Sequence, residues 1–376
     1  MTAAPSVTPP APPGGPSRPY WPRILLTLAI GAAGGAAFDY LRVPLAWMIG
    51  AMVFCTVASL SGVPVYMSQK IRFPMIAVLG VMLGSAFTPA IVGRVGEWGP
   101  TVAGLALYVV LVTAILYYYF RKLCGHDVVT SYFAASPGGL NEMQIVSHAL
   151  GGDDRVVSLV HASRILLVVL TIPLGFMIFE GYQSGQRGAL GPSILSIPLK
   201  DWAAMAAIAV VGSALGKYLR LPAGALTGTM LLSGIVHVMG WSDSKPPAEL
   251  IAAAQIVIGS AVGARFAGVA LKKIVRVLGE SVGATVIMLG ITLGLAWGLQ
   301  PYAGTSFEAL ILAYAPGGFA EMSLIALALG IDAAFVSAHH ILRIVMLVIV
   351  APPTFRYFWR KRQRRANAQA AERSKP

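Results

Sequence analysis

Long apolar segments separated by short polar connections make up most of this chain. A helix needs about 20 consecutive apolar residues to cross the hydrocarbon core of a bilayer. Ten segments come close to or exceed that length, at 22–40, 44–61, 73–92, 98–120, 156–179, 202–218, 222–240, 250–271, 277–299 and 333–355. Each of them predicts a helix. The pattern therefore predicts an all-α, multi-pass integral membrane protein.

Two further apolar segments, at about 130–150 and 307–330, are interrupted by helix-breaking residues and a carboxylate. Residues 136–143 read SPGGLNEM, and residues 315–322 read APGGFAEM. Irregular backbone at membrane depth is tolerated only where protein or a water-filled cavity satisfies its polar groups. We therefore expect both segments to be broken or re-entrant and to lie beside a cavity.

The chain repeats itself at a shift of 179 residues, since Pro137 recurs as Pro316. Apolar sequence matches itself easily, but charged and Pro-Gly-Gly positions in register do not. The same shift relates three polar residues and two glycines of the first copy to counterparts in the second. These pairs are Ser158 and Ser337, His161 and His340, Arg164 and Arg343, Gly80 and Gly259, and Gly84 and Gly263. The sequence therefore predicts two tandem copies of one module.

Positive charges in the connections indicate how the two copies are oriented. Lys and Arg concentrate on the cytoplasmic side of a membrane protein, and the basic tail places both termini there. If the interrupted segments span, seven such residues lie inside and eight outside; if they re-enter, ten lie inside and five outside. Only the second arrangement obeys the rule. It gives each copy about five spans and one re-entrant segment and inverts the second copy, a plan common among secondary transporters.

Composition along the chain predicts a division into five parts. They are a disordered Pro- and Ala-rich N-terminus at 1–21, a membrane repeat at 22–180, a linker at 181–201, a second membrane repeat at 202–355 and a basic cytoplasmic tail at 356–376. The N-terminal part has neither the apolar region nor the cleavage site of a signal peptide. We therefore expect the first apolar segment to remain as a membrane anchor.

Overall composition indicates that lipid is the main partner. The chain is 56% hydrophobic and 11% charged, with a mean hydropathy of +0.73. Soluble domains usually carry about 25% charged residues. The net charge of +13 lies largely in the tail and the short connections. Charge so placed contacts anionic lipid on the cytoplasmic side, so we expect a lipid bilayer and no nucleic acid as partner.

Glu142 and Glu321 follow the paired glycines in otherwise apolar surroundings. A carboxylate at membrane depth is costly unless it is paired, hydrated or protonated. One interpretation is that these two groups bind and release a proton or cation during transport. The other is that each caps the N-terminus of its own helix, which favours negative charge. The spacing of the residues does not distinguish between these two interpretations.

Ser158, His161 and Arg164 are spaced by three residues and so share one helix face. The second copy repeats that face with Ser337, His340 and Arg343. One interpretation is that the face lines a cavity in which the arginine holds an anionic group of a substrate. The other is an internal salt bridge from each arginine to the glutamate of its copy. A third interpretation is that the arginine forms a salt bridge in one copy and contacts the substrate in the other.

The first copy is the more polar at the tip of its interrupted segment. Ser136, Asn141 and His148 stand where the second copy has alanine, alanine and leucine. If one copy contacts the solute through side chains, we expect it to be the first.

The positions of the glycines predict two different roles for them. Backbone N–H groups freed at a helix start suit an anion, and the glycines in that position are Gly138, Gly139, Gly317 and Gly318. Glycines four residues apart, as in the pairs Gly80–Gly84 and Gly259–Gly263, permit close packing of helices. That packing suits a homodimer and contacts within one chain equally well.

Neither a metal site nor a cofactor is predicted. Cys55 and Cys124 lie in or beside apolar segments and form no ligand motif. His339 and His340 are adjacent and therefore point to different faces of a helix. The sequence has no phosphate-binding motif of the kind that an ATP-driven pump needs. We expect no enzyme activity.

The blocks SPGGLNEM and APGGFAEM, with the downstream His-x-x-Arg helix, resemble the AbrB family of bacterial membrane proteins over about residues 20–356. Members carry the labels ammonia monooxygenase and regulator of gene expression. The resemblance implies a fold similar to inverted-repeat antiporters and anion transporters. The histidines lack the spacing with carboxylates that copper or non-haem iron needs, and no separate DNA-binding domain is evident. Regulation by such a protein would be indirect.

Together these observations predict a secondary transporter of a small anionic or zwitterionic solute in the bacterial inner membrane. The expected substrate- or ion-binding residues are Gly138, Gly139, Asn141, Glu142, Ser158, His161, Arg164, Gly317, Gly318, Glu321, Ser337, His340 and Arg343. The first alternative is a membrane sensor or regulator that binds a ligand without moving it. The second is a membrane oxidoreductase, which would contain bound metal.

Overall fold

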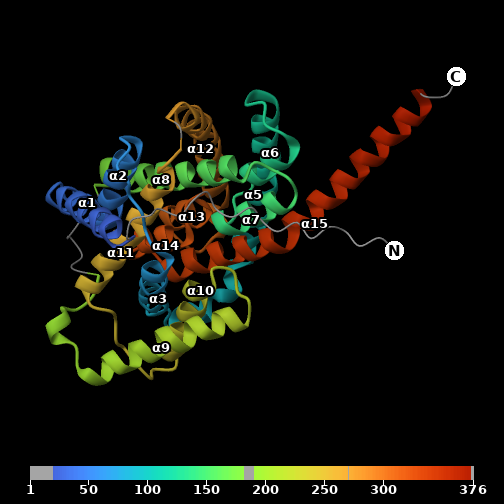
Figure 1. Cartoon of the computed structure of the whole chain (residues 1–376). Coiled ribbons are helices and arrows are strands. Elements are labelled where there is room, and N and C mark those ends of the chain that lie inside the picture. The colour runs from blue at the N-terminus through green and yellow to red at the C-terminus, as the bar shows by residue number, and fades with distance from the viewer. Residues whose placement is uncertain (1–19, 182–189, 270, 374–376) are drawn as a thin grey trace, which may run out of the picture.

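The computed structural model describes residues 20–181, 190–269 and 271–373, and the regular elements of that part are all helices (Figure 1). The first half contains α1 (Tyr20–Tyr40), α2 (Ala46–Leu60), α3 (Gln69–Gly84), α4 (Pro89–Arg94), α5 (Gly99–Tyr118), α6 (Val128–Ala135), α7 (Leu140–Ala149) and α8 (Asp154–Phe179). The second contains α9 (Leu199–Tyr218), α10 (Gly224–Val238), α11 (Ala248–Gly263), α12 (Leu271–Leu299), α13 (Phe307–Tyr314), α14 (Phe319–Ala328) and α15 (Ala333–Arg373). Short 3₁₀ or π turns are η1 (Val95–Trp98), η2 (Tyr119–Leu123), η3 (Ile194–Ser196), η4 (Ala264–Phe266) and η5 (Gln300–Tyr302).

Seven helices in the described part are long and apolar enough to cross a membrane. They are α1, α8, α9 and α12, α5 with its flanking turns, α11 with η4, and the part of α15 up to Phe355. The chain is therefore a multi-pass membrane protein, as its composition predicted. Helices α2 and α10 have 15 residues each and α3 has 16, so the ten spans expected from the sequence remain a prediction.

The helices of the second half follow the same order as those of the first. Helices α6, α7 and α8 begin at Val128, Leu140 and Asp154, and α13, α14 and α15 begin at Phe307, Phe319 and Ala333. Each pair of starting residues differs by 179, which is the shift found in the sequence. The predicted N-terminal part up to residue 19 and linker residues 182–189 lie outside the described residues.

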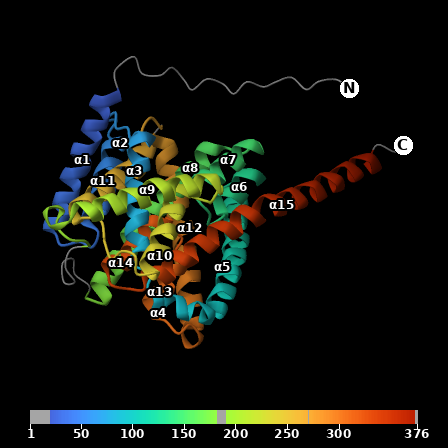
Figure 2. The same ribbon diagram turned by 90° about the horizontal axis from the view of Figure 1, so that it is seen from below.

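The helices form two bundles, each built from both halves of the chain. The first bundle contains α1, α2, α3, α9, α10 and α11, in which α2 packs on α1 and α11, and α10 packs on α9 and α3. The second bundle contains α5 to α8 and α12 to α15, in which α12 packs on α5 and α8, and α15 packs on α5, α13 and α14. Figures 1 and 2 show α1, α2 and α11 grouped on one side of the molecule and α5, α6 and α7 on the other.

Paired glycines allow the close helix packing of the first bundle. A Cβ atom at Gly84 of α3 would come within 2.5 Å of the carbonyl oxygen of Met230 in α10. A Cβ at Gly263 of α11 would come within 2.8 Å of the carbonyl oxygen of Met52 in α2. Backbones can approach this closely only where no side chain intervenes. The glycine pairs therefore serve packing within the chain, one of the two roles that the sequence left open.

Helices α5 and α12 run in opposite directions. Beyond the end of α5, the carbonyl oxygen of Cys124 accepts a hydrogen bond from Arg276 Nη2 at 3.0 Å, near the start of α12. Just before α5, Arg94 donates to the carbonyl oxygen of Gly304, which follows α12. These two contacts place the end of each helix beside the start of the other.

Helices α3 and α12 begin four and six residues earlier than the apolar segments at 73–92 and 277–299 indicated. The count of charges placed Arg72 in a connection, but α3 begins at Gln69 and contains it. Ser68 caps this helix, because its hydroxyl accepts a hydrogen bond from the Lys70 backbone N–H at 3.2 Å. Helix α12 begins at Leu271 and likewise contains Arg276. A capped polar turn lengthens a helix without adding apolar residues, so hydropathy alone misses it.

Candidate functional site

Helices α6 and α7 form a hairpin, called here the first hairpin (residues 128–149). The backbone N–H of Asp153, just after α7, donates to the hydroxyl of Thr130 in the first turn of α6 at 2.8 Å. The two ends of the segment therefore lie together. With eight and ten residues, the helices are about 12 and 15 Å long, each roughly half of a hydrocarbon core.

Helices α13 and α14 form the second hairpin (residues 307–328), with the same two helix lengths. Ser306, just before α13, and Gly330, just after α14, line one surface pocket. The two ends of this segment therefore also lie near each other.

The glycines at the tip of each hairpin make room for nearby side chains and have ordinary backbone angles where they cap a helix. Gly139 and Gly318, the N-cap residues of α7 and α14, have ordinary extended φ values of −66° and −75°. A Cβ at Gly139 would overlap the carboxylate of Glu142, and a Cβ at Gly318 would overlap that of Glu321. The second glycine of each turn therefore makes room for the glutamate three residues later.

The first glycine of each turn makes room for the following methionine. A Cβ at Gly138 would come within 3.0 Å of Met143 Cγ, and a Cβ at Gly317 within 2.6 Å of Met322 Cε. Both methionine side chains are buried. The spacing of glycines, glutamate and methionine in the motif thus follows from packing inside one turn.

A buried arginine holds each turn from the opposite side. Arg164 of α8 donates from Nη1 to the carbonyl oxygen of Ser136 at 3.3 Å and from Nη2 to that of Gly138 at 3.2 Å. Arg343 of α15 donates from Nη1 to the carbonyl oxygen of Ala315 at 2.6 Å and from Nη2 to that of Gly317 at 3.1 Å. A guanidinium suits this place because the C-terminal carbonyls of a helix carry partial negative charge.

The histidine of each face completes the same arrangement. Nε2 of His161 lies 3.0 Å from the carbonyl oxygen of Phe133, and Nε2 of His340 lies 2.9 Å from that of Leu312. The other ring nitrogen, Nδ1, lies 3.4 Å from Arg164 Nη2 in the first copy and 2.9 Å from Arg343 Nη2 in the second. Because an arginine can only donate, Nδ1 accepts and the proton of each neutral ring lies on Nε2.

The arginines thus bind backbone carbonyls where the sequence offered a salt bridge or a substrate contact. They are 3% and 2% exposed. The Nε atoms of Arg164 and Arg343 are buried and have no hydrogen-bond partner within the described part of the chain. Of the five N–H groups of each guanidinium, two donate to carbonyl oxygens of the turn and one to the histidine.

Glu142 and Glu321 lie in the first turns of α7 and α14, where the helix dipole favours a carboxylate. Each carboxylate is folded back against the N-cap glycine of its helix. Glu321 is 7% exposed, whereas Glu142 is half-buried. This geometry agrees with the capping role and leaves the coupling role open, since a capping carboxylate still titrates. Asn141 belongs to α7, and its side chain lies outside the described part.

The remaining predicted residues lie away from the turns. Ser337 is buried, and its hydroxyl has no hydrogen-bond partner in the described residues, while Ser158 is half-buried. His148 lies in the last turn of α7 and approaches Asp154 at 3.7 Å, with 70% of its side chain exposed. It therefore stands at the open end of the hairpin, so the expectation that it makes the tip more polar was wrong. Its distance from the glycines, more than two helical turns, explains the difference.

Two arginines of the first bundle lie on elements that pack against the second bundle and were not among the predicted site residues. Arg72 belongs to α3, which packs on α14, the helix that carries Glu321. Arg265 belongs to η4, which packs on α8. A sequence signal existed for Arg265, since the position aligned with it in the first copy is Ala86. An unmatched charge between apolar segments marks a place where the copies differ in role.

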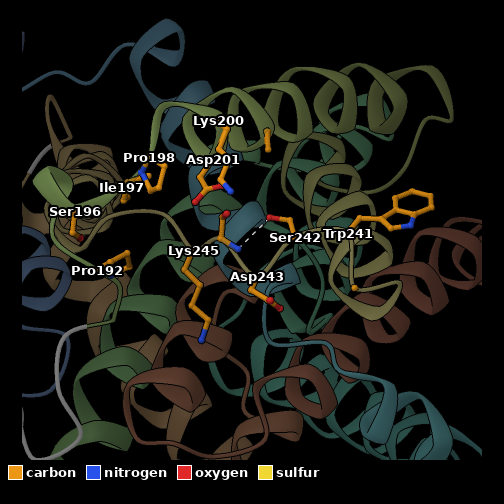
Figure 3. Close-up of a pocket in the computed structure, with 13 residues that line it drawn as sticks. Pro192, Ser196, Ile197, Pro198, Lys200, Asp201, Trp241, Ser242, Asp243 and Lys245 are labelled. Carbon is orange, nitrogen blue, oxygen red and sulfur yellow. Dashed lines mark hydrogen bonds between the residues drawn. The ribbon is translucent and has the colours of Figure 1, made fainter.

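A separate pocket of about 700 Å³ lies among connections of the first bundle (Figure 3). Figure 3 shows Lys200 and Asp201, at the start of α9, together with Asp243 and Lys245 from the connection after α10. Charges of both signs line it, and the hairpin residues are not part of its lining. The residues described by the structure contain no group of three or more His, Cys, Asp and Glu that would hold a metal ion.

Comparison with known proteins gives consistent matches. A family model described as "Transition state regulatory protein AbrB" matches residues 47–359. The chain is 26% identical over 350 residues to "Uncharacterized protein YhjN" of Bacillus subtilis (strain 168), covering 88% of this chain and 91% of that protein. It is also 26% identical over 334 residues to "Putative regulator AbrB" of Escherichia coli (strain K12), covering 88% of this chain and 93% of that protein.

Proposed function

The chain belongs to the AbrB family, and on that premise we propose that it is a secondary transporter of a small anionic or zwitterionic solute in the bacterial inner membrane. One observation carries the proposal. Two half-length helical hairpins each have a glutamate at the tip and a buried arginine bonded to the turn, and α14 of the second hairpin packs on α3 of the first bundle. Broken helices that bring helix termini and charges to membrane depth are how many secondary transporters build their sites.

The opposite directions of two corresponding helices support an inverted orientation of the copies, which the proposal includes. Helices α5 and α12 occupy corresponding places in the two copies and run in opposite directions. The distribution of Lys and Arg favours the same arrangement, with both termini in the cytoplasm. Hairpins that enter from opposite faces would bring their tips together near the middle of the membrane.

In the proposed mechanism the glutamates couple transport to protons. Glu321 lies on α14, which packs on α3 of the first bundle, so its protonation changes the charge at a surface along which the bundles would move. Arg164 and Arg343 keep the turns in place by binding their carbonyl oxygens. A site alternately open to the two sides of the membrane then needs only a displacement of one bundle against the other.

Ligand stabilisation followed by flux tests the proposal. The purified chain is heated with organic acids, amino acids and inorganic ions, because a ligand of the folded state raises its apparent stability. Solutes that stabilise are then tested for uptake into proteoliposomes under a pH gradient. We expect pH-driven uptake that Glu321→Gln abolishes while the variant remains folded. A stabilising solute that never crosses the membrane would exclude transport.

A second candidate is a membrane sensor that regulates gene expression indirectly, without enzyme activity of its own. The name of the relative from Escherichia coli describes a regulator. Helix α15 continues for 41 residues to Arg373 and projects away from the bundles (Figures 1 and 2), which would suit a partner. Removing residues 357–376 separates the two functions, since a sensor would lose its effect on expression whereas a transporter would retain flux.

A further inference from the structure

The pocket shown in Figure 3 is lined by charged side chains of both signs. Lys200 and Asp201 come from the first turn of α9, and Asp243 and Lys245 come from the connection after α10. None of these four side chains forms an ion pair or a hydrogen bond with another residue of the described ranges 20–181, 190–269 and 271–373. Two ammonium groups and two carboxylates in one pocket therefore keep their bonding capacity for a ligand.

Hydrogen bonds hold one wall of this pocket in place at both of its ends. His237, in the last turn of α10, brings Nε2 to 3.1 Å from the carbonyl oxygen of Ser244. At the other end, the backbone N–H of Ala248, the first residue of α11, donates to the carbonyl oxygen of Pro192 at 2.9 Å. The connection between α10 and α11 is thus tied to α10 and to the segment before α9, so the pocket is preformed.

The position of the pocket along α9 indicates its depth in a membrane. Helix α9 is long and apolar enough to cross the bilayer and begins at Leu199, so its first turn lies at the boundary between hydrocarbon and water. Trp241 is 71% exposed and points away from the other lining residues (Figure 3). Exposed tryptophan at the end of a spanning helix is typical of the headgroup level of a bilayer. The four charges are therefore placed among lipid headgroups.

An apolar groove runs along the exposed face of α10 and ends beside this pocket. It is lined by Phe87 and by apolar residues from Met230 in α10 to Met239, the C-cap of that helix. Met239 is followed directly by Gly240, which lines the charged pocket. From Met230 to Met239 the helix rises about 14 Å, which is roughly the depth of hydrocarbon in one leaflet. The groove has the length of one leaflet and ends at the charged pocket.

We propose that the groove and the pocket together bind one phospholipid with a zwitterionic headgroup, such as phosphatidylethanolamine. Lys200 and Lys245 attract its phosphate. The carboxylates of Asp201 and Asp243 accept hydrogen bonds from its primary ammonium, and one acyl chain fills the groove beside Met239.

The charges favour a lipid over a second copy of the chain as the occupant. An apolar helix of a second copy would fill the groove but leave the four charged side chains of the pocket without partners. An amphipathic molecule with both signs of charge in its head satisfies the groove and the pocket at once. The lipid site does not depend on whether the chain transports a solute.

Native mass spectrometry of the full-length chain, delipidated in detergent and titrated with defined lipids, tests this site. The probes are phosphatidylethanolamine, phosphatidylcholine, whose ammonium has no N–H to donate, and phosphatidylglycerol, whose headgroup has no positive charge. We expect one phosphatidylethanolamine per chain, bound about tenfold or more tightly than either of the other two. Equal retention of all three would indicate a general lipid coat and overturn the assignment.

Substitutions at exposed positions locate the site without disturbing the core. Lys200→Gln and Asp243→Asn should each weaken binding of phosphatidylethanolamine by about tenfold, and Lys217→Gln, at the opposite end of α9, should not. Ile235→Asn puts an amide into the groove and should also weaken binding, whereas Val210→Asn, on the exposed face of α9 outside the groove, should not. Unchanged affinity in the three site variants, or an equal loss in the controls, would overturn the assignment.

Two further measurements test the other occupants. O-phosphoethanolamine carries the headgroup without acyl chains, so we expect it to raise the thermal midpoint less than the lipid does. Equal stabilisation by both would assign the pocket to a soluble zwitterion and overturn the lipid site. Ile235→Cys, in a chain lacking Cys55 and Cys124, should stay monomeric when membranes are oxidised with copper phenanthroline. A disulfide-linked dimer would assign the groove to a second copy and equally overturn the proposal.

Discussion

Arg343 on α15 donates to the carbonyl oxygen of Ala315 at 2.6 Å, across 28 residues of chain. The equivalent bond in the first copy joins Arg164 to the carbonyl oxygen of Ser136, also 28 residues away, at 3.3 Å. The duplicated arginine therefore has one structural task in both copies, which is to hold the carbonyl end of a half-length helix. The copies differ instead in the charges of the first bundle, since Arg265 of the second copy aligns with Ala86 of the first.

Removing the guanidinium of the second copy should destabilise the fold. Arg343→Met keeps much of the side-chain volume but leaves the carbonyl oxygens of Ala315 and Gly317 without their donor. We expect a loss of about 2–5 kcal/mol in the free energy of unfolding, measured in detergent. Arg94→Met is the control, because Arg94 is exposed, and it should cost less than about 1 kcal/mol. Equal midpoints for both variants would contradict the assigned role.

Adding one methyl group at a tip should disturb the glutamate without unfolding the protein. In Gly318→Ala the new Cβ would overlap the carboxylate of Glu321 and displace it from the start of α14. We expect a changed pH dependence of solute uptake, measured in proteoliposomes. Gly294→Ala is the matched control, since a Cβ there meets nothing within 4 Å. A pH profile identical in both variants would argue against a coupling role for this carboxylate.

The orientation of the copies can be tested with cysteines in a chain lacking Cys55 and Cys124. In the inverted arrangement Arg155→Cys faces the cytoplasm and Tyr302→Cys faces the outside, and both positions are exposed. A membrane-impermeant maleimide added to whole cells should label the second variant only. Copies in parallel orientation predict the opposite result, with labelling of Arg155→Cys only.

Packing between the copies predicts that two glycine-to-alanine substitutions change the thermal midpoint differently. Alanine stabilises a helix by about 1 kcal/mol relative to glycine. In Gly263→Ala the Cβ would meet the backbone nitrogen of Thr56 at 2.7 Å, and overpacking of this kind costs about 1–3 kcal/mol. The thermal midpoint should therefore fall for Gly263→Ala and stay or rise for Gly290→Ala, where the space is open. A rise for both would mean that α2 and α11 separate readily.

Much of the helical framework could be predicted because lipid imposes a simple rule on sequence. A chain that must satisfy its own backbone in an apolar solvent forms helices wherever long apolar segments occur. The expected segment at 156–179 became α8, Asp154–Phe179, and that at 98–120 became α5, Gly99–Tyr118. The break at Pro137 was equally visible, since a proline followed directly by two glycines strongly disfavours helix.

The charged contacts were decided by the tertiary structure alone. Arg164 and Glu142 belong to one copy and looked like partners in the sequence, yet the arginine binds the carbonyls of Ser136 and Gly138. Arg72 looked like a connection residue, yet it lies in α3, which packs on α14, the helix that carries Glu321. Helix periodicity gives the face on which a side chain lies but not the element that faces it. That choice depends on how the two bundles assemble, through contacts between residues far apart in the chain.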